Sequence, residues 1–247
     1  MERPPTTTPL ADLLAEAKAV VAEASSANLT LRITGGVAIG LLCPSANVPP
    51  LLREYKDLDV VGDSSQARAI DALLRNRGYL AYEEFNSLHG NTRLLYWDGE
   101  NQRQLDVFLD RIRMCHELDL RGRLTLNDLT IDPADLLLTK LQIVQTNERD
   151  LKDAIALFAD CSPADNRVAS VLGNDWGWWR TVTEVLDKLS RYVLALPEFP
   201  QTTEVVEGIS RLRDRIDRQP KSLRWKARAK MGDRVRWYEL PDEVEED

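Results

Sequence analysis

The hydrophobic pattern of the chain changes its period at Asp132-Pro133. Before this point, short apolar runs alternate with polar residues, as in half-buried strands. Beyond it, apolar residues recur every three or four positions, which predicts helices over residues 134–145, 148–160, 164–172, 176–195 and 202–218. The pattern therefore predicts an α+β protein, with a mixed-sheet domain over residues 1–132 followed by an α-helical domain over residues 133–247.

Composition places the chain among ordinary globular proteins, since 43% of its 247 residues are hydrophobic and 29% are charged. No apolar run approaches the roughly 20 residues that cross a bilayer, and residues 1–6 hold no apolar signal core. We therefore expect a cytoplasmic protein with no membrane partner. Three widely spaced cysteines, Cys43, Cys115 and Cys161, predict neither a disulfide framework nor a zinc site.

Charge is unevenly distributed along the chain. The net charge of −8 argues against nucleic-acid binding by the whole surface. However, residues 211–236 carry eleven Lys or Arg with Trp225 among them, and residues 239–247 are strongly acidic. The basic stretch is compatible with an RNA contact through phosphates and stacking. A solvated helix with i,i+4 pairs such as Arg213 and Asp217 explains much of this stretch without any ligand.

The first domain contains three predicted helices, over residues 10–24, 37–42 and 67–76. Its predicted strands cover residues 29–33, 57–61, 80–85, 92–97, 103–109 and, at an edge, 124–126. Asp98-Gly99 between two of these strands predicts a hairpin. In the second domain, Trp176, Trp178 and Trp179 begin a helix and are expected in its core, while His89 and His116 have no acid–base partner pattern.

Gly35-Gly36 stands between a predicted strand and a predicted helix. Glycine lets a backbone approach an anionic group closely, and a helix N-terminus stabilises negative charge. Alone, such a pair also marks a simple tight turn. The carboxylates that follow it in the sequence give it a possible function.

Three aspartates occupy alternating positions of two predicted strands. Asp57 and Asp59 alternate with Leu58 and Val60, and Asp106 alternates with its apolar neighbours in the same way. Alternate residues of a strand point to one face, so these carboxylates are expected to emerge together. Such a group can hold Mg²⁺, or Mn²⁺, against a polyphosphate, which suits phosphoryl or nucleotidyl transfer. The alternative is a set of solvated charges on an exposed face.

These motifs resemble the nucleotidyltransferase fold of the DNA polymerase beta superfamily. The resemblance covers residues 30–110 and is carried by Gly35-Gly36, the stretch 53–59 (Arg-Glu-Tyr-Lys-Asp-Leu-Asp) and Leu105-Asp106-Val107. Small nucleotidyltransferases that modify aminoglycosides and lincosamides have a similar pattern. Here Tyr55 stands where their pattern has histidine, and the interval between the glycines and the aspartates is longer.

The resemblance implies Mg²⁺-dependent transfer of a nucleoside monophosphate from a nucleoside triphosphate, such as ATP, to an acceptor hydroxyl. By this likeness the catalytic metal ligands are Asp57, Asp59 and Asp106. The nucleotide-binding residues would include Gly35, Gly36, Arg53 and Lys56. The acceptor remains open between a small molecule, tRNA and protein.

The helical domain has a second resemblance, to the AbiEii-type nucleotidyltransferases of toxin–antitoxin systems. It is carried by the leucine-rich stretch that contains Lys140 and by the helix start Arg149-Asp150-Leu151-Lys152-Asp153. This likeness implies that Lys140 touches nucleotide phosphates and that Asp150 organises the site. The alternative is structural, with Lys140 extending past core leucines and Asp150 capping a helix. A nucleotide-binding module without turnover is a further alternative for the whole protein.

Overall fold

The protein is described by a computed structural model over residues 7–163 and 165–240. It divides into two compact units. The sheet unit contains the described residues up to Leu42, together with Glu54–Ile112 and Asp119–Asp132. The helical unit contains Cys43–Arg53, Arg113–Leu118 and the described residues from Pro133 onward. The predicted α+β class is confirmed.

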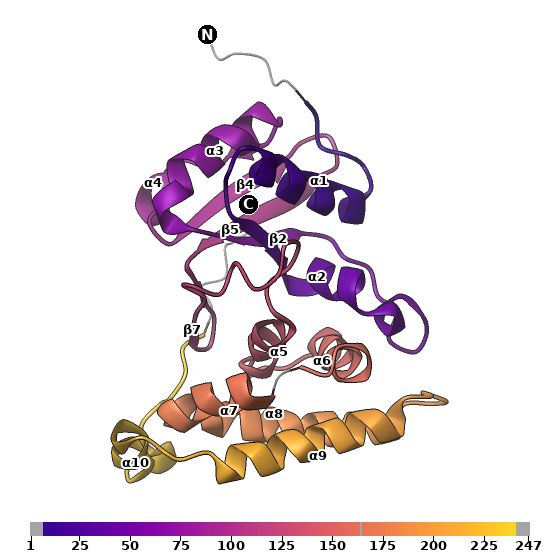
Figure 1. The fold of residues 1–247 in the computed structure, drawn as a ribbon, viewed down its shortest axis with the longest axis vertical. Helices are drawn as coiled ribbons and strands as arrows, with labels where there is room; N and C mark the ends of the chain where they lie inside the picture. The colour runs from indigo at the N-terminus through magenta and orange to yellow at the C-terminus, as the bar shows by residue number, and fades with distance from the viewer. Residues whose placement is uncertain (1–6, 164, 241–247) are drawn as a thin grey trace. The chain divides into compact units, whose positions relative to one another are not determined.

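Helices and strands both occur in the first half of the chain, where the last four strands follow one another directly, and helices form the second half (Figure 1). The strands are β1 (Leu31–Thr34), β2 (Leu58–Gly62), β3 (Leu80–Ala81), β4 (Arg93–Asp98), β5 (Arg103–Leu109), β6 (Arg111–Arg113) and β7 (Glu117–Asp119). The α-helices are α1 (Leu13–Ser26), α2 (Gly35–Leu42), α3 (Ala67–Asn76), α4 (Glu83–His89), α5 (Pro133–Leu141), α6 (Glu148–Asp160), α7 (Asp165–Asn174), α8 (Trp176–Ala195), α9 (Thr202–Arg218) and α10 (Leu223–Ala229). None of the helices in the described ranges is both long and apolar enough to span a membrane.

The sheet unit is built on a five-stranded mixed sheet with the order β1-β2-β5-β4-β3. Strands β2 and β5 pair in parallel, and the other neighbours are antiparallel. A parallel pair needs a crossover connection, and α3, α4 and two strands lie between β2 and β5 in the sequence. The crossover therefore brings residues almost fifty positions apart into register, Asp59 with Asp106 among them.

One face of this sheet is apolar, and the other carries polar side chains together with buried apolar ones such as Val61 and Leu95. Leu58, Val60, Leu105 and Val107 lie on the apolar face and are at most 1% exposed. Helix α3 closes this face through Ile70, whose side chain contacts Gly62. The opposite face carries Asp59 and Asp106, because strand residues alternate between faces. The expectation that Leu58 and Val60 face a core is confirmed.

A buried ion pair holds the first helix to the rest of the sheet unit. Glu16 in α1 is fully buried and accepts two hydrogen bonds from the Arg77 guanidinium, both 2.7 Å. The Tyr79 hydroxyl donates a third at 2.8 Å. Burial alone would raise the pKa of Glu16, but these hydrogen bonds together lower it below its ordinary value. Hydrophobic periodicity does not predict this pairing, because a charged residue such as Glu16 is expected at the surface of a helix.

The helical unit packs α5 to α9 around an apolar core, with α10 against the start of α8 and the end of α7. Two of its helices begin with strong caps. Asn147 and Asp150 form a reciprocal capping box at α6, and Asp175 accepts the Trp178 amide hydrogen at α8. Trp176 and Trp178 are buried, as predicted, while Trp179 is half-buried.

Several predicted elements differ from the observed ones. Residues 80–85 form only a two-residue strand before α4, which has Glu83 and Glu84 in its first turn. Residues 124–126 form a turn rather than an edge strand, and the β6–β7 sheet and α10 were not predicted. Helix α5 ends at Leu141 instead of 145. The helix predicted over 164–172 is observed as Asp165–Asn174. Residue 164 lies outside the described residues, and so do residues 1–6 and 241–247, which include most of the acidic tail.

The two compact units do not divide the chain at a single boundary. The prediction placed all of residues 1–132 in one domain, whereas Cys43–Arg53 and Arg113–Leu118 group with the helical unit. Both segments make local contacts there. The Ser45 amide and hydroxyl donate to Asp160 at 2.8 and 2.6 Å, and the His116 amide donates to Gln142 at 3.0 Å. The order of elements along the sequence does not show that these two segments group with the helical unit.

Candidate active site

Asp59 and Asp106 lie opposite each other in the neighbouring parallel strands β2 and β5. Opposed residues of paired strands point to the same face, with strands about 4.8 Å apart. Asp59 is partly exposed, whereas Asp106 is 4% exposed. The crossover thus brings together two of the three carboxylates that the alternating pattern predicted on one face.

Gly35 closes one side of this carboxylate pair. It is the first residue of α2 and has a φ of +64°, a conformation that favours glycine. A β-carbon added at Gly35 would lie 2.1 Å from Asp59 Oδ2. Only glycine therefore lets the helix begin directly against the carboxylate. The pair Gly35-Gly36 forms the first turn of α2 rather than a separate turn before it, so its amides are among the N–H groups that have no partner within the helix.

Thr34 extends the polar row across a third strand. It pairs with Asp59 in antiparallel register, so its side chain lies on the carboxylate face. The side chain is buried, and its Oγ1 has no hydrogen-bond partner within residues 7–163 and 165–240. A buried hydroxyl without a partner is uncommon, because desolvating it costs about 1–3 kcal/mol. Thr34 therefore offers an unused oxygen beside Asp59.

Arg93 holds Asp106 from the adjacent strand β4. Its Nε and one terminal nitrogen donate to the two carboxylate oxygens at 2.6 and 2.5 Å. The guanidinium also lies 5.5 Å from the Phe85 ring centroid and 5.3 Å from that of Phe108. The two cation–π contacts hold the guanidinium, and its bidentate pair with Asp106 fixes the orientation of the carboxylate. Gln104 adds a longer bond to Asp106, at 3.2 Å.

Two further predicted residues lie just before β2. Asp57 immediately precedes the strand and is exposed, and Lys56 before it is exposed as well. Both belong to the sheet unit, together with Gly35, Gly36, Asp59 and Asp106. Tyr55, which stands at the histidine position of the resembled pattern, packs its ring against Gly40 of α2, where a β-carbon would lie 2.7 Å from the ring.

The other three predicted residues gather in the helical unit around Asp153. Arg53 donates to both oxygens of Asp153, at 2.8 and 2.7 Å. Lys140 Nζ lies 2.9 Å from Asp153 and 3.7 Å from Asp150. Arg53, Lys140 and Asp150 thus form one cluster of buried and half-buried charges, and Asp150 also caps α6.

Sequence reasoning did not select Thr34, Arg93 or Asp153 for this chemistry. For Asp153 a signal existed, because it is three residues from Asp150 and therefore on the same face of α6. Arg93 carries no comparable signal. Arg93 sits opposite Phe108 and is therefore a diagonal neighbour of Asp106, a position that only the β4–β5 register gives it.

The oxygen donors suit Mg²⁺ or Mn²⁺, which prefer carboxylates, hydroxyls and water. No group of three or more His, Cys, Asp or Glu side chains in the described part of the chain is arranged to hold a metal ion. Mg²⁺ is commonly bound by one or two carboxylates, with waters and substrate phosphates completing its shell. Asp59, Asp106 and the partnerless Thr34 hydroxyl fit such a site, because a carboxylate bound by arginine keeps further lone pairs.

Comparison with known proteins gives a limited likeness. No family model matches the chain. No curated protein matches it either. Among solved structures, the antibiotic-resistance factor ANT(2'')-Ia aligns over 58% of this chain and 80% of its own, with 15% identity and a TM-score of 0.37. An antigenic nucleotidyltransferase-like protein from Paracoccidioides brasiliensis aligns over 85% of this chain and 94% of its own, with 15% identity and a TM-score of 0.38.

Proposed function

We propose that the protein transfers a nucleoside monophosphate from a nucleoside triphosphate to an acceptor hydroxyl, with the help of Mg²⁺ or Mn²⁺. The observation that carries the proposal is the direct juxtaposition of Asp59 and Asp106 at the start of α2, where Gly35 leaves no room for a β-carbon. Paired carboxylates beside free helix amides provide sites for a cation and for phosphates together.

In this proposal the acceptor oxygen attacks the α-phosphorus. The bond from that phosphorus to its bridging oxygen breaks, and pyrophosphate leaves with the electron pair. Asp106 accepts the acceptor's proton, because the β2–β5 register places it beside Asp59 and Arg93 fixes its orientation. When bound, the cation neutralises phosphate charge and lowers the pKa of the acceptor hydroxyl.

Each remaining residue has a role in binding. Asp59 and Asp106 would hold the cation, and the resemblance adds Asp57, which is exposed just before the strand. The Gly35 and Gly36 amides would receive the β- and γ-phosphates at the start of α2. Lys56 would neutralise phosphate charge. We assign the same role to Arg53 and Lys140, which pair with Asp153 within the helical unit. Asp150 would keep Lys140 in place.

The acceptor separates the variants of this function. An antibiotic-modifying enzyme uses a small-molecule hydroxyl, whereas an AbiEii-like toxin acts on tRNA or protein. In a catalytically silent module, nucleotide binds and no pyrophosphate appears. Growth arrest on expression, relieved by Asp59→Asn, would favour the toxin.

The test is incubation of the purified protein with Mg²⁺, each α-³²P nucleoside triphosphate and total cellular RNA, with pyrophosphate release followed in parallel. Asp57→Asn and Asp59→Asn should abolish transfer without unfolding the protein, and Asp214→Asn on the exposed face of α9 is the matched control. An Asp59→Asn protein with full activity would disprove the proposal. Binding of nucleotide without pyrophosphate, over a panel of RNA, protein and aminoglycoside acceptors, would leave only the silent module.

A further inference from the structure

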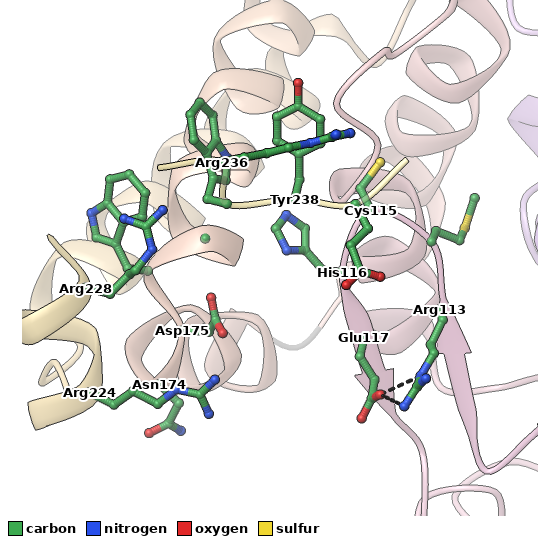
Figure 2. Close-up of a pocket in the computed structure, with 15 residues that line it drawn as sticks. Arg113, Cys115, His116, Glu117, Asn174, Asp175, Arg224, Arg228, Arg236 and Tyr238 are labelled. Carbon is green, nitrogen blue, oxygen red and sulfur yellow. Dashed lines mark hydrogen bonds and ion pairs between the residues drawn. The ribbon is translucent and has the colours of Figure 1, made fainter. Parts of the chain in front are cut away.

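The helical unit contains a cavity of about 550 Å³ that none of the carboxylates proposed for catalysis lines. Figure 2 shows its walls. Residues 113–117 form one side, the start of α8 with Asp175 forms the floor, and α10 with the segment 236–239 forms the remainder. Its lining combines four arginines, the carboxylates Glu117, Asp175 and Glu239, and the rings of His116, Trp176, Trp237 and Tyr238, so the arginines outnumber the carboxylates; the arginines are Arg113, Arg224, Arg228 and Arg236.

The C-terminal segment is held in a defined position over α8. Trp237 donates its indole N–H to the Thr181 hydroxyl at 3.1 Å, and its ring meets Trp176 edge-on at 5.9 Å. Gly177 permits this approach, because a β-carbon there would lie 2.7 Å from the Trp237 carbonyl oxygen. The Glu239 amide also donates to the Cys115 carbonyl. The aromatic wall is therefore preorganised.

The arginines divide into one structural residue and others that face solvent. Arg228 stacks on Trp176 at 4.6 Å and donates to the Gly232 carbonyl at 2.9 Å, so it fastens the segment. Arg113 pairs with Glu117 at 2.7 Å. Arg224 and Arg236 are exposed, and Arg236 lies 4.8 Å from the Tyr238 ring centroid. Exposed guanidiniums beside a half-buried aromatic ring are the groups that contact phosphates and stack on bases.

Charge indicates how long the ligand is. Seven basic residues lie between Lys221 and Arg236, and Asp233 is the single acidic residue in that stretch. The whole chain has a net charge of −8, so this is a local reversal of sign. A mononucleotide would need two or three cations. Lys221 donates to the Ile216 carbonyl and Arg228 fastens the segment, which leaves five of the seven, and this number suits the repeating charge of a phosphodiester chain better than a single nucleotide.

We propose that this cavity and α10 bind single-stranded nucleic acid, with one base against Tyr238 and the flanking phosphates on Arg224 and Arg236. The inference rests on the proposed function only in assigning this strand as the acceptor. Binding itself is independent of catalysis. RNA and DNA share the chemistry that the cavity recognises, so both are tested.

The experiment is fluorescence anisotropy with the full chain and labelled single strands of about 12 nucleotides, as RNA and as DNA. Arg224→Gln/Arg236→Gln is compared with Arg149→Gln/Arg191→Gln, which removes the same charge. Arg149 and Arg191 are exposed and lie toward the other end of α8, where Tyr192 donates to Glu148 at 3.0 Å. Arg191 is about 22 Å along the helix from Trp176. Circular dichroism verifies that each variant is folded.

The first double variant should bind about 10-fold more weakly, and its log–log salt slope should fall by about 1.4, as for two lost phosphate contacts. The matched control should do neither. Tyr238→Leu should lose about 5-fold or more, and Tyr238→Phe should retain affinity. Equal weakening in both double variants, no binding of either strand by the wild-type protein, or equal affinity for a polyglutamate peptide would overturn the proposal.

The two proposals can fail separately. The Asp59→Asn protein should bind the strand as the wild-type protein does, since Asp59 is not in the cavity lining. Strand binding with no nucleotidyl transfer would refute the proposed function and leave the binding site standing. Transfer to small molecules without strand binding would support the proposed function and refute the nucleic-acid site.

Discussion

Gly35 and Asp59 are so close that a β-carbon on the glycine would lie 2.1 Å from the Asp59 carboxylate. The position of the Asp59 carboxylate therefore depends on the residue that begins helix α2. Because the clashing atom is the end of a side chain, a larger residue at position 35 would turn Asp59 away rather than unfold the sheet. This makes the glycine a direct test of the candidate site.

Gly35→Ala is expected to reduce nucleotidyl transfer by about 100-fold, since displacement of a catalytic group by about 1 Å is sufficient for that. Its stability cost should be about 1–2 kcal/mol, from an alanine held at φ +64°. Gly122→Ala is the matched control, because Gly122 has φ +71° and no atom within 4 Å of an added β-carbon. Urea unfolding and activity are measured for both variants. Equal activity losses in the two would show that Asp59 is not the cause.

Arg93→Leu should destabilise the protein by about 3 kcal/mol, because it leaves the buried Asp106 carboxylate without its cation. Arg93→Lys should lose less, since it keeps the charge without the bidentate geometry. If Mg²⁺ binds Asp106, it should raise the melting temperature of Arg93→Leu more than that of the wild-type protein. The Arg93→Leu/Asp106→Asn protein should show no such gain. A Mg²⁺ effect that persists in the double variant would place the cation elsewhere.

His116 should make stability depend on pH. It is half-buried against Trp178 and hydrogen-bonded to Thr181 at 2.9 Å, and the loss of solvation lowers its pKa to about 4. In the unfolded chain its pKa is about 6.5, so the unfolded state takes up the proton first. Stability from the neutral ring is complete above pH 6.5 and is lost as the pH falls to 4, by at most about 3 kcal/mol.

The measurement is urea unfolding at pH 7, 6, 5 and 4 for the wild-type protein and His116→Gln. The variant should be less stable at pH 7 and should lose less stability on acidification. His89→Gln controls for removal of a histidine as such, because His89 is the other histidine and is exposed. Parallel pH profiles for the wild-type protein and His116→Gln would contradict the assignment.

Local pattern predicted the long periodic elements accurately. The helices over residues 148–160, 176–195 and 202–218 and the strand over 103–109 have the predicted bounds. These segments carry many apolar residues in one period, and caps such as Asn147 and Asp175 mark where they begin. Elements with few periodic residues, such as α4, α10 and the β6–β7 sheet, were missed because propensity in short segments yields to tertiary packing.

The candidate site was predictable in part. Strand alternation indicated which aspartates share a face, and the glycine pair indicated a helix start. Neither indicates that Arg93 holds Asp106, that the Thr34 hydroxyl has no partner among the described residues, or that Arg53 and Lys140 meet at Asp153. Each of these depends on residues distant in sequence.

The sequence by itself determined the α+β class and the change to helices after Asp132, because hydrophobic period acts within a single element. It also determined that the side chains of Asp59 and Asp106 would each point away from the apolar face of their strand. The tertiary structure alone decided that these strands are neighbours, parallel and in this register. It likewise decided that segments 113–117, 174–177 and 224–239 enclose one cavity. Such pairings follow from burying the apolar faces of many elements together, and no local window of sequence contains that information.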